Sequence, residues 1–223
     1  MQSSRPSQQE SSSKYQLSLV PKGLLNRAAQ HLSQKNVLSV LCLIGNHSAL
    51  EFVQQNVQPL KADGVFEFAL VNAFTACRVN NHSWPMPVLR NLFFTAADRQ
   101  KLRLIGPPLP NAGPFRLYRG VAGRGKARRT AGISWTANPN AACWFAMRFA
   151  EFLDDPAVYE YLADQSEVLC RYSDRNEDEY LLDVRQPKRV ERMALSIAEM
   201  QQRAAQWKHE VCTQAMPGEA ESG

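Results

Sequence analysis

The sequence predicts an α+β fold in which a helical lobe precedes a domain of two packed, mostly antiparallel sheets that form a cleft. Between residues 22 and 105 apolar residues recur at helical spacing, whereas after residue 114 short segments alternate as strands do. The segment IGPPLPNAGP (105–114) separates these two patterns, with four prolines and two glycines in ten residues. We therefore expect a helical lobe over 21–105 and a second domain over 115–212, with disordered polar ends at 1–20 and 213–223.

The helical lobe contains patterns typical of a packed core. Leu24, Leu25, Ala28 and Leu32 follow helical spacing. The stretch GVFEFALVNAFTACRV (64–79) is apolar almost all round and predicts a central buried helix. The segment after Pro85 predicts one or two further helices. None of these patterns points to catalysis.

The second domain alternates short strands with turns. Asn138-Pro139 supplies an N-cap and a first-turn proline for a helix over NAACWFAMRFAEFL, with Ala142, Phe145, Phe149 and Phe152 on its inward face. Residues 196–212 predict a polar helix. The expected strands are FRLYR (115–119), GISWT (132–136), AVYEYLAD (157–164), EVLCRYS (167–173), EYLLDV (179–184) and KRVERMAL (188–195).

Composition narrows the function classes. The five cysteines are odd in number and widely spaced, and the four histidines are scattered, which predicts free thiols and no metal site. A net charge of +5 is mild; it fits an anionic ligand without implying nucleic acid. No apolar run reaches the length of a membrane span, and the N-terminus lacks the apolar stretch of a secretory signal. We expect a cytoplasmic protein, of the producing cell or of a host cell if the chain is exported.

Three short motifs could belong to one site. Arg119 ends the first expected strand, and Ser134 and Thr136 lie two apart on the second. Glu177 lies two residues before Glu179, which begins EYLLDV. Strand residues two apart share a face, so two carboxylates placed side by side are tolerated best at an open cleft. Taken singly, Arg119 is explained by a surface cation at a strand end, and Ser134 and Thr136 by ordinary strand residues. For Glu177 and Glu179 alone, a solvated turn and a functional site are equally good explanations.

In this order the motifs LYRG (117–120), GISWT followed by NPNAACWFA (138–146), and RNEDEYLLD (175–183) resemble the mono-ADP-ribosyltransferase family of the Arg-Ser-Glu type. That family includes bacterial toxins, effectors and a phage anti-CRISPR enzyme. The resemblance covers residues 115–193 and implies the family's split β-sandwich, with 115–212 as the NAD-binding catalytic domain. Trp135 departs from the family, which commonly has a small residue between the two hydroxyl residues.

The resemblance implies a role for each site residue. Glu179 would stabilise the cationic ribose that forms when NAD loses nicotinamide, and Glu177 would orient the acceptor. Arg119 would bind the NAD pyrophosphate, and Gly120 would let the main chain approach the nicotinamide. The hydroxyl of Ser134 would hold Glu179 or the ribose. The remaining NAD-binding residues would be Trp135, Thr136 and Phe145, with Trp144 as a less favoured alternative to Phe145.

The function implied is mono-ADP-ribosyl transfer from NAD to a macromolecular acceptor, in bacterial or phage conflict and without a metal. A protein acceptor is favoured over nucleic acid, although the basic loop GRGKARRT (123–130) permits either; that loop would close over the NAD phosphates or meet an acidic target. Two alternatives stay open: an NAD glycohydrolase that uses water as the acceptor, and a non-catalytic module that binds a partner.

Overall fold

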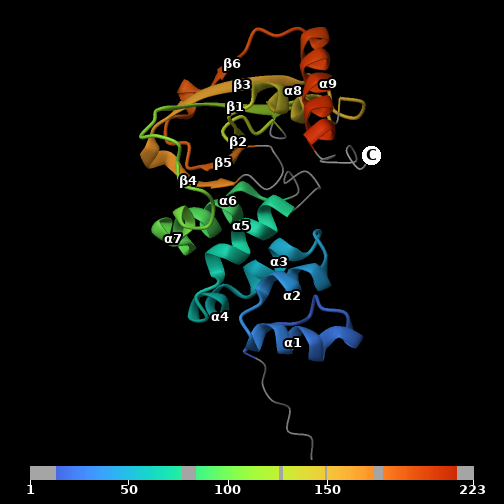
Figure 1. The fold of residues 1–223 in the computed structure, drawn as a ribbon, viewed down its shortest axis with the longest axis vertical. Helices are drawn as coiled ribbons and strands as arrows, with labels where there is room; N and C mark the ends of the chain where they lie inside the picture. Colours follow the sequence, from blue (N-terminus) through green and yellow to red (C-terminus); the bar gives the residue numbers. More distant parts are fainter. Residues whose placement is uncertain (1–13, 77–83, 126–127, 149, 173–177, 215–223) are drawn as a thin grey trace, which may run out of the picture. The chain divides into compact units, whose positions relative to one another are not determined.

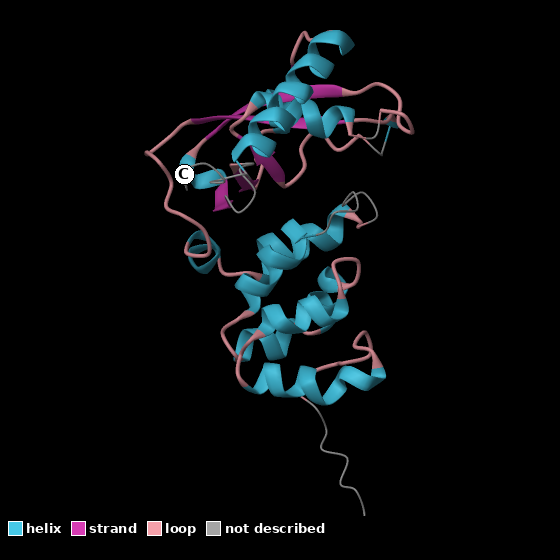
Figure 2. Ribbon diagram, turned by 45° about the vertical axis from the view of Figure 1, so that its right-hand side comes forward, coloured by secondary structure: helices cyan, strands magenta, loops and turns pink. Residues whose placement is uncertain are grey.

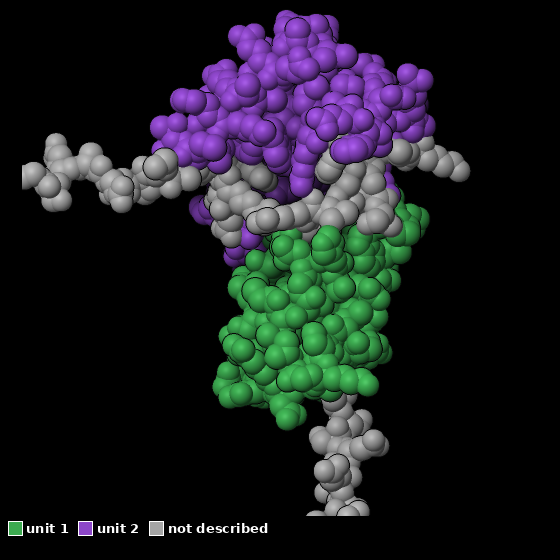
Figure 3. Space-filling model, turned by 90° about the vertical axis from the view of Figure 1, so that its right-hand side faces the viewer, with its two compact units in different colours: residues 1–96 green, residues 97–223 purple. Residues whose placement is uncertain are grey.

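The computed structural model describes residues 14–76, 84–125, 128–148, 150–172 and 178–214. It divides into two compact units, residues 1–96 and 97–223 (Figure 3). Helices make up the first unit, and all the strands that the structure describes lie in the second (Figure 2). The mixture of helices and an antiparallel sheet agrees with the α+β class expected from the sequence.

Short helices build the first unit around one apolar helix. Helix α5 lies where the sequence predicts a buried helix, and seven of its eleven residues are buried. In order the elements are η1 (Lys22–Leu24), α1 (Leu25–Ser33), α2 (Val37–Ile44), α3 (Ala49–Gln55), α4 (Val57–Ala62), α5 (Phe66–Ala76), α6 (Met86–Arg90) and the π-helical η3 (Asn91–Ala96).

Residues 14–20 correct the expectation of a disordered leader over 1–20. Tyr15 and Val20 are buried, and the Tyr15 hydroxyl donates a hydrogen bond to the Asp63 carboxylate. The main-chain N–H of Gln16 donates to Oδ1 of the fully buried Asn56 at 2.7 Å. Tertiary contacts therefore order this polar segment. Residues 1–13 lie outside the described part of the chain.

The second unit begins with helix α7 (Arg99–Arg103), earlier than the boundary expected at 105–114. Its other elements are β1 (Phe115–Val121), β2 (Ser134–Thr136), α8 (Pro139–Met147), β3 (Ala157–Ala163), η5 (Gln165–Glu167), β4 (Val168–Tyr172), β5 (Glu179–Leu182), η6 (Pro187–Arg189), β6 (Glu191–Arg192) and α9 (Ile197–Gln214). Helix α9 confirms the expected polar helix and runs two residues past 212, while 215–223 lie outside the described residues.

The described strands form one six-stranded sheet in the order β4-β5-β2-β1-β3-β6, with every pair antiparallel (Figure 1). We expected two packed sheets. The two halves β4-β5-β2 and β1-β3-β6 are instead joined through β2, because Thr136 is in register with both Tyr118 and Glu179. Tyr118 and Thr136 are the one registered pair recorded between the described residues of β1 and β2, so this joint is narrow.

Different groups cover the two faces of the sheet. On one face, small residues of α8 pack with Val158 of β3 and with Met200 and Ala204 of α9. On the other face, Leu117, Trp135, Tyr161 and Tyr180 form a second apolar cluster, against which Leu109 packs. Both clusters contain residues of β1 or β3, so the sheet is the common support of the core.

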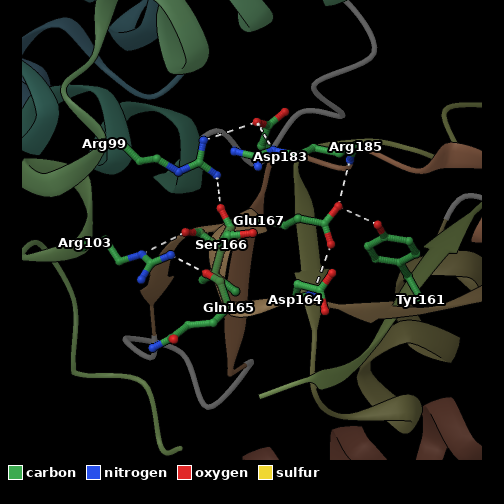
Figure 4. A network of polar contacts seen from close by, with 10 residues as sticks. Arg99, Arg103, Tyr161, Asp164, Gln165, Ser166, Glu167, Asp183 and Arg185 are labelled. Atoms are coloured by element: carbon green, nitrogen blue, oxygen red, sulfur yellow. Dashed lines mark hydrogen bonds and ion pairs between the residues drawn. The ribbon is translucent and has the colours of Figure 1, made fainter. Parts of the chain in front are cut away.

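Helix α7 is tied to the turn between β3 and β4 by two arginines (Figure 4). Nη2 of Arg99 donates to the Ser166 carbonyl at 2.5 Å, and its Nη1 lies 3.2 Å from the Asp183 carboxylate. Nε of Arg103 donates to the Val168 carbonyl at 2.9 Å, and its Nη2 donates to the Gln165 carbonyl. These bonds explain why the second unit begins before the proline-rich segment.

Candidate functional site

Arg119 lies one residue beyond the joint between the two halves of the sheet. Its Nε donates to the Arg129 carbonyl at 2.9 Å, and its Nη1 donates to the Ser134 carbonyl. Gly132 makes room for the guanidinium, because a Cβ at that position would lie 2.4 Å from Cζ of Arg119. The side chain of Arg119 therefore bridges β1 and the residues that lead into β2.

The charge of Arg119 is partly desolvated. Burial is the main cause that lowers its pKa, to about 10; the Glu179 carboxylate opposes this shift and the nearby Arg129 cation adds to it. At neutral pH the guanidinium is still protonated. A cation with reduced access to water gains more from an anionic partner than a fully solvated one does.

Glu179 opens strand β5 directly opposite Thr136. It is half-buried, and its charge acts on Arg119. The structure thus brings Arg119, Ser134 and Glu179 together on the three adjacent strands β1, β2 and β5, although 60 residues separate the first from the last in sequence.

The expectation that Glu177 shares a strand face with Glu179 stays a prediction. Glu177 lies outside the described residues. Strand β5 begins only at Glu179, and Asp178 has a φ of 41°, so regular strand alternation does not extend through Asp178. The Asp178 carboxylate accepts a hydrogen bond from Nε of Arg171 at 2.7 Å, which stabilises the irregular conformation.

Ser134 and Thr136 contribute differently from one another. Ser134 is half-buried and uses its main-chain carbonyl to hold Arg119. Thr136 is buried, and its hydroxyl accepts a hydrogen bond from the Asn138 N–H at 3.0 Å. Asn138 in turn caps α8 by accepting from the N–H groups of Asn140 and Ala141. The Thr136 side chain therefore fixes the passage from β2 into α8.

Two of the expected NAD contacts are corrected by packing. The Trp135 side chain is 1% exposed, packs against Tyr161 in the core and donates its Nε1–H to the Gly132 carbonyl at 2.7 Å. It is therefore a core residue. At Gly120 a Cβ would lie 1.9 Å from the Ala142 carbonyl oxygen, so the close approach that needs a glycine is that of α8, in place of nicotinamide.

The aromatic residues of α8 lie on a face different from the one expected. The buried face consists of Ala141, Ala142, Cys143 and Ala146, because only small residues fit where α8 meets Gly120. Phe145 and Trp144 are half-buried; their ring centroids lie 6.4 Å and 4.9 Å from that of Trp207 in α9. The helix ends at Met147, and Phe152 beyond it is 81% exposed.

The basic loop 123–130 is anchored through Arg128. Its Nε donates to the Tyr159 hydroxyl at 3.0 Å, and its Nη1 donates to the Asp155 carboxylate. Asp155 also pairs with Arg192 at 2.9 Å. Sequence reasoning missed Asp155, which lies far along the chain. It also missed the role of Gly132, whose position two residues before β2 was the available signal. Lys126 lies outside the described residues.

The site offers carboxylate, guanidinium and main-chain groups for binding. Within the described residues, no group of three or more His, Cys, Asp or Glu side chains is arranged to hold a metal ion. No described helix combines the length and the apolar character that crossing a membrane requires. Comparison with known proteins finds no matching family model, curated relative or solved structure.

Proposed function

We propose that this protein transfers ADP-ribose from NAD to a macromolecular acceptor, on a fold of the ADP-ribosyltransferase type. The observation that supports the proposal best is the juxtaposition of Arg119 and Glu179 on the central strands, near enough for the carboxylate to act on the pKa of the guanidinium. The narrow joint between β1 and β2 also suits the split sheet of that fold. A protein is the acceptor we favour, and the setting would be that of an effector, toxin or inhibitor of a defence system.

Arg119 and Glu179 match two charged parts of NAD, the anionic pyrophosphate and the ribose that becomes cationic during the reaction. Among the described residues, the hydrogen bonds of the Arg119 guanidinium go from Nε and Nη1 to main-chain carbonyls. Nη2 is therefore the donor that we assign to a pyrophosphate oxygen. Glu179, on the next strand but one, is the carboxylate that we assign to the ribose.

The reaction itself exchanges one bond at the ribose. The bond from C1′ to the nicotinamide nitrogen breaks, and its electron pair leaves with nicotinamide. The acceptor's nucleophilic atom then bonds to C1′ and releases its proton. Glu179 favours this exchange by placing negative charge beside the ribose as it becomes cationic. We assign Glu177 to the orientation of the acceptor and the release of its proton.

The remaining residues support this arrangement. Ser134 positions Arg119 through its carbonyl. Thr136 holds the end of β2 against α8 through its bond to Asn138. Phe145 keeps the assignment as the ring that stacks on nicotinamide, because it is half-buried and lies in the last turn of the helix that follows β2.

The proposal is tested by incubating the full chain with NAD radiolabelled in its adenylate phosphate together with a cell lysate. We expect the label to become attached to macromolecules and to be released from them by protease digestion. Label released by nuclease would identify a nucleic-acid acceptor. Free ADP-ribose as the sole product would identify an NAD glycohydrolase. Unchanged NAD would favour a partner-binding module and contradict the proposal.

Glu179→Gln tests the catalytic assignment. We expect NAD turnover to fall by about 10² to 10³-fold while NAD binding persists, because the carboxylate acts mainly in the transition state. The matched control is Glu191→Gln, which changes an exposed carboxylate on β6. Steady-state turnover and equilibrium binding of NAD separate the two effects. Near-normal turnover in Glu179→Gln would show that the catalytic carboxylate lies elsewhere.

A further inference from the structure

A pocket of about 350 Å³ lies beside the edge strand β4, on the second unit. Its walls are formed by Arg103 of α7, by residues 107–109, 111 and 112 of the proline-rich segment, and by Gln165, Cys170 and Arg171. Its volume falls within the range of small-molecule sites, which is about 300–1,000 Å³. None of these residues has a role in the proposed transferase reaction.

Arg103 gives the pocket a positive charge, for which the described residues supply no ion-pair partner. Among the described residues its hydrogen bonds go to the carbonyls of Gln165 and Val168, and no carboxylate forms an ion pair with it. Burial, and then the nearby Arg99 cation, lower its pKa. A guanidinium has five N–H donors in a planar fork, so Arg103 keeps donors for a ligand while main-chain groups hold it in place.

Arg171 supplies a second guanidinium that is also held in place. Its Nε donates to the Asp178 carboxylate at 2.7 Å, and its Nη1 lies 3.4 Å from the Pro108 carbonyl. The guanidinium also stacks on the ring of Tyr180, at 5.9 Å from the centroid. Asp178 neutralises one of the two arginine charges that line the pocket, and none of the described lining residues is acidic.

The proline-rich segment contributes an apolar wall to the same pocket. Gly106 lies so close to β4 that a Cβ there would be 1.6 Å from the Arg171 carbonyl oxygen. Pro107, Pro108 and Leu109 follow directly and line the pocket. Proline fixes its own φ, so this wall loses little freedom when a ligand binds. The pocket therefore combines two positioned cations with a preformed apolar surface.

We propose that this pocket binds a small phosphate monoester. The phosphate oxygens accept hydrogen bonds from Arg103 and Arg171, and the organic part packs against Leu109 and the adjacent prolines. Guanidinium pairs suit phosphate because each can donate two parallel N–H bonds to neighbouring oxygens. Asn111 and Gln165 add polar groups at the rim. This inference goes beyond the proposed function and does not depend on it.

The test measures binding of phenyl phosphate and of inorganic phosphate to the full chain by calorimetry. We expect phenyl phosphate to bind more tightly than inorganic phosphate, because the ring uses the apolar wall. Equal affinities would assign the site to free phosphate and overturn the monoester proposal. Arg103→Gln and Arg171→Gln should each weaken phenyl phosphate binding about tenfold or more, the loss expected for one charge-assisted hydrogen bond.

Two control variants separate this site from others. Arg116→Gln removes an exposed arginine of β1, and Arg119→Lys alters the proposed NAD site; both should bind phenyl phosphate as the wild type does. Loss of binding in Arg119→Lys alone would place the phosphate at the proposed NAD site and overturn the inference. Failure of NAD turnover, in contrast, would leave this binding unaffected.

A second measurement avoids substitution altogether, since Arg103 also bonds to the main chain. In the wild-type protein, titration with phenyl phosphate should shift the amide resonances of Ala112 and Gln165, which line the pocket. The amide of Gly23, in the first unit, should not move. Absence of shifts at Ala112 and Gln165 up to the solubility limit of the probe would overturn the proposal.

Discussion

At the scale of single residues, two glycines of the second unit make room for different neighbours. A Cβ at Gly120 would meet main-chain atoms of α8, with the Ala146 nitrogen at 2.5 Å and the Ala142 oxygen at 1.9 Å. A Cβ at Gly132 would meet the guanidinium of Arg119. Main-chain atoms of a packed helix cannot move away cheaply, whereas the end of a long side chain can. Gly120 is therefore a packing requirement, and Gly132 shapes the site.

Gly120→Ala should destabilise the protein by about 1–3 kcal/mol, the usual cost of overpacking a core. Urea denaturation followed by circular dichroism would measure the change in the free energy of unfolding. Gly23→Ala is the matched control, since a Cβ there has no atom within 4 Å. Equal stability of the two variants would show that α8 does not pack against β1 as described.

Gly132→Ala should leave the free energy of unfolding nearly unchanged but weaken NAD binding, because the new methyl group displaces the Arg119 guanidinium from the Ser134 carbonyl. The expected loss is about tenfold in affinity, equivalent to one charge-assisted hydrogen bond. Equilibrium titration with NAD measures it, with Gly23→Ala again as the control. Unchanged NAD affinity would remove Arg119 from the proposed site.

At the scale of elements, β2 is the piece on which the site depends. This strand of three residues pairs with β5 on one side and meets β1 at a single registered pair on the other. Its end is fixed by the Thr136 hydroxyl, which accepts from the Asn138 N–H, and by the cap that Asn138 places on α8. Because β2 is short and has few paired residues, it needs this anchor to keep Ser134 in place.

Asn138→Ala should lower the free energy of unfolding by about 0.5–2 kcal/mol, since it removes the two N-cap hydrogen bonds of α8. Ser48→Ala is the matched control, because Ser48 occupies the N-cap of α3 without a side-chain capping bond. Chemical denaturation of both variants measures the difference. A larger effect at Ser48 than at Asn138 would contradict the capping described here.

At the scale of the whole molecule, the chain divides between Ala96 and Ala97. Helix α7 belongs to the second unit because Arg99 and Arg103 satisfy carbonyl groups at the β3–β4 turn. Nearby, the buried Glu167 accepts from the Tyr161 hydroxyl at 2.6 Å and from the Arg185 N–H at 2.9 Å (Figure 4). A buried carboxylate that is fully hydrogen-bonded contributes to a cooperative fold, whereas an unpaired one would oppose it.

A fragment of residues 97–214 should therefore fold alone and unfold in one cooperative transition. A fragment of residues 106–214, which lacks α7, should melt at a lower temperature because the carbonyls of Gln165, Ser166 and Val168 lose their arginine donors. Differential scanning calorimetry of both fragments checks this. Identical melting temperatures would show that α7 adds nothing to the second unit.

The helix and strand positions were largely predictable from the sequence because they depend on local pattern. Strands β2 to β5 each fall within an expected strand segment, whereas β1 runs two residues past the expected FRLYR (115–119). The Asn138-Pro139 pair correctly marks the start of α8. At the ends of elements the pattern was a weaker guide. The expected strand 188–195 is reduced to Glu191–Arg192, and α8 ends at Met147, so that Phe152 lies beyond it. Phe149 lies outside the described residues.

The candidate site was predictable in part. Order along the chain pointed to Arg119, Ser134 and Glu179, and the structure brings these three together. Their contacts were not predictable. Arg119 donates to main-chain carbonyls, and because every residue type has one, the sequence does not show which residue accepts the hydrogen bond. Asp155 was missed for the same reason, since its partners Arg128 and Arg192 are far from it in sequence.

The sequence by itself determined the class of fold, the positions of most strands, the start of α8 and the residues that carry charge. Periodicity and capping act between neighbours along the chain, and so they can be read directly from it. Only the tertiary structure decided that Trp135 and Gly120 serve the core, that α7 joins the second unit and that one sheet unites the strands. These outcomes depend on which distant segments pack together, and that packing is set by shape and register across the whole unit.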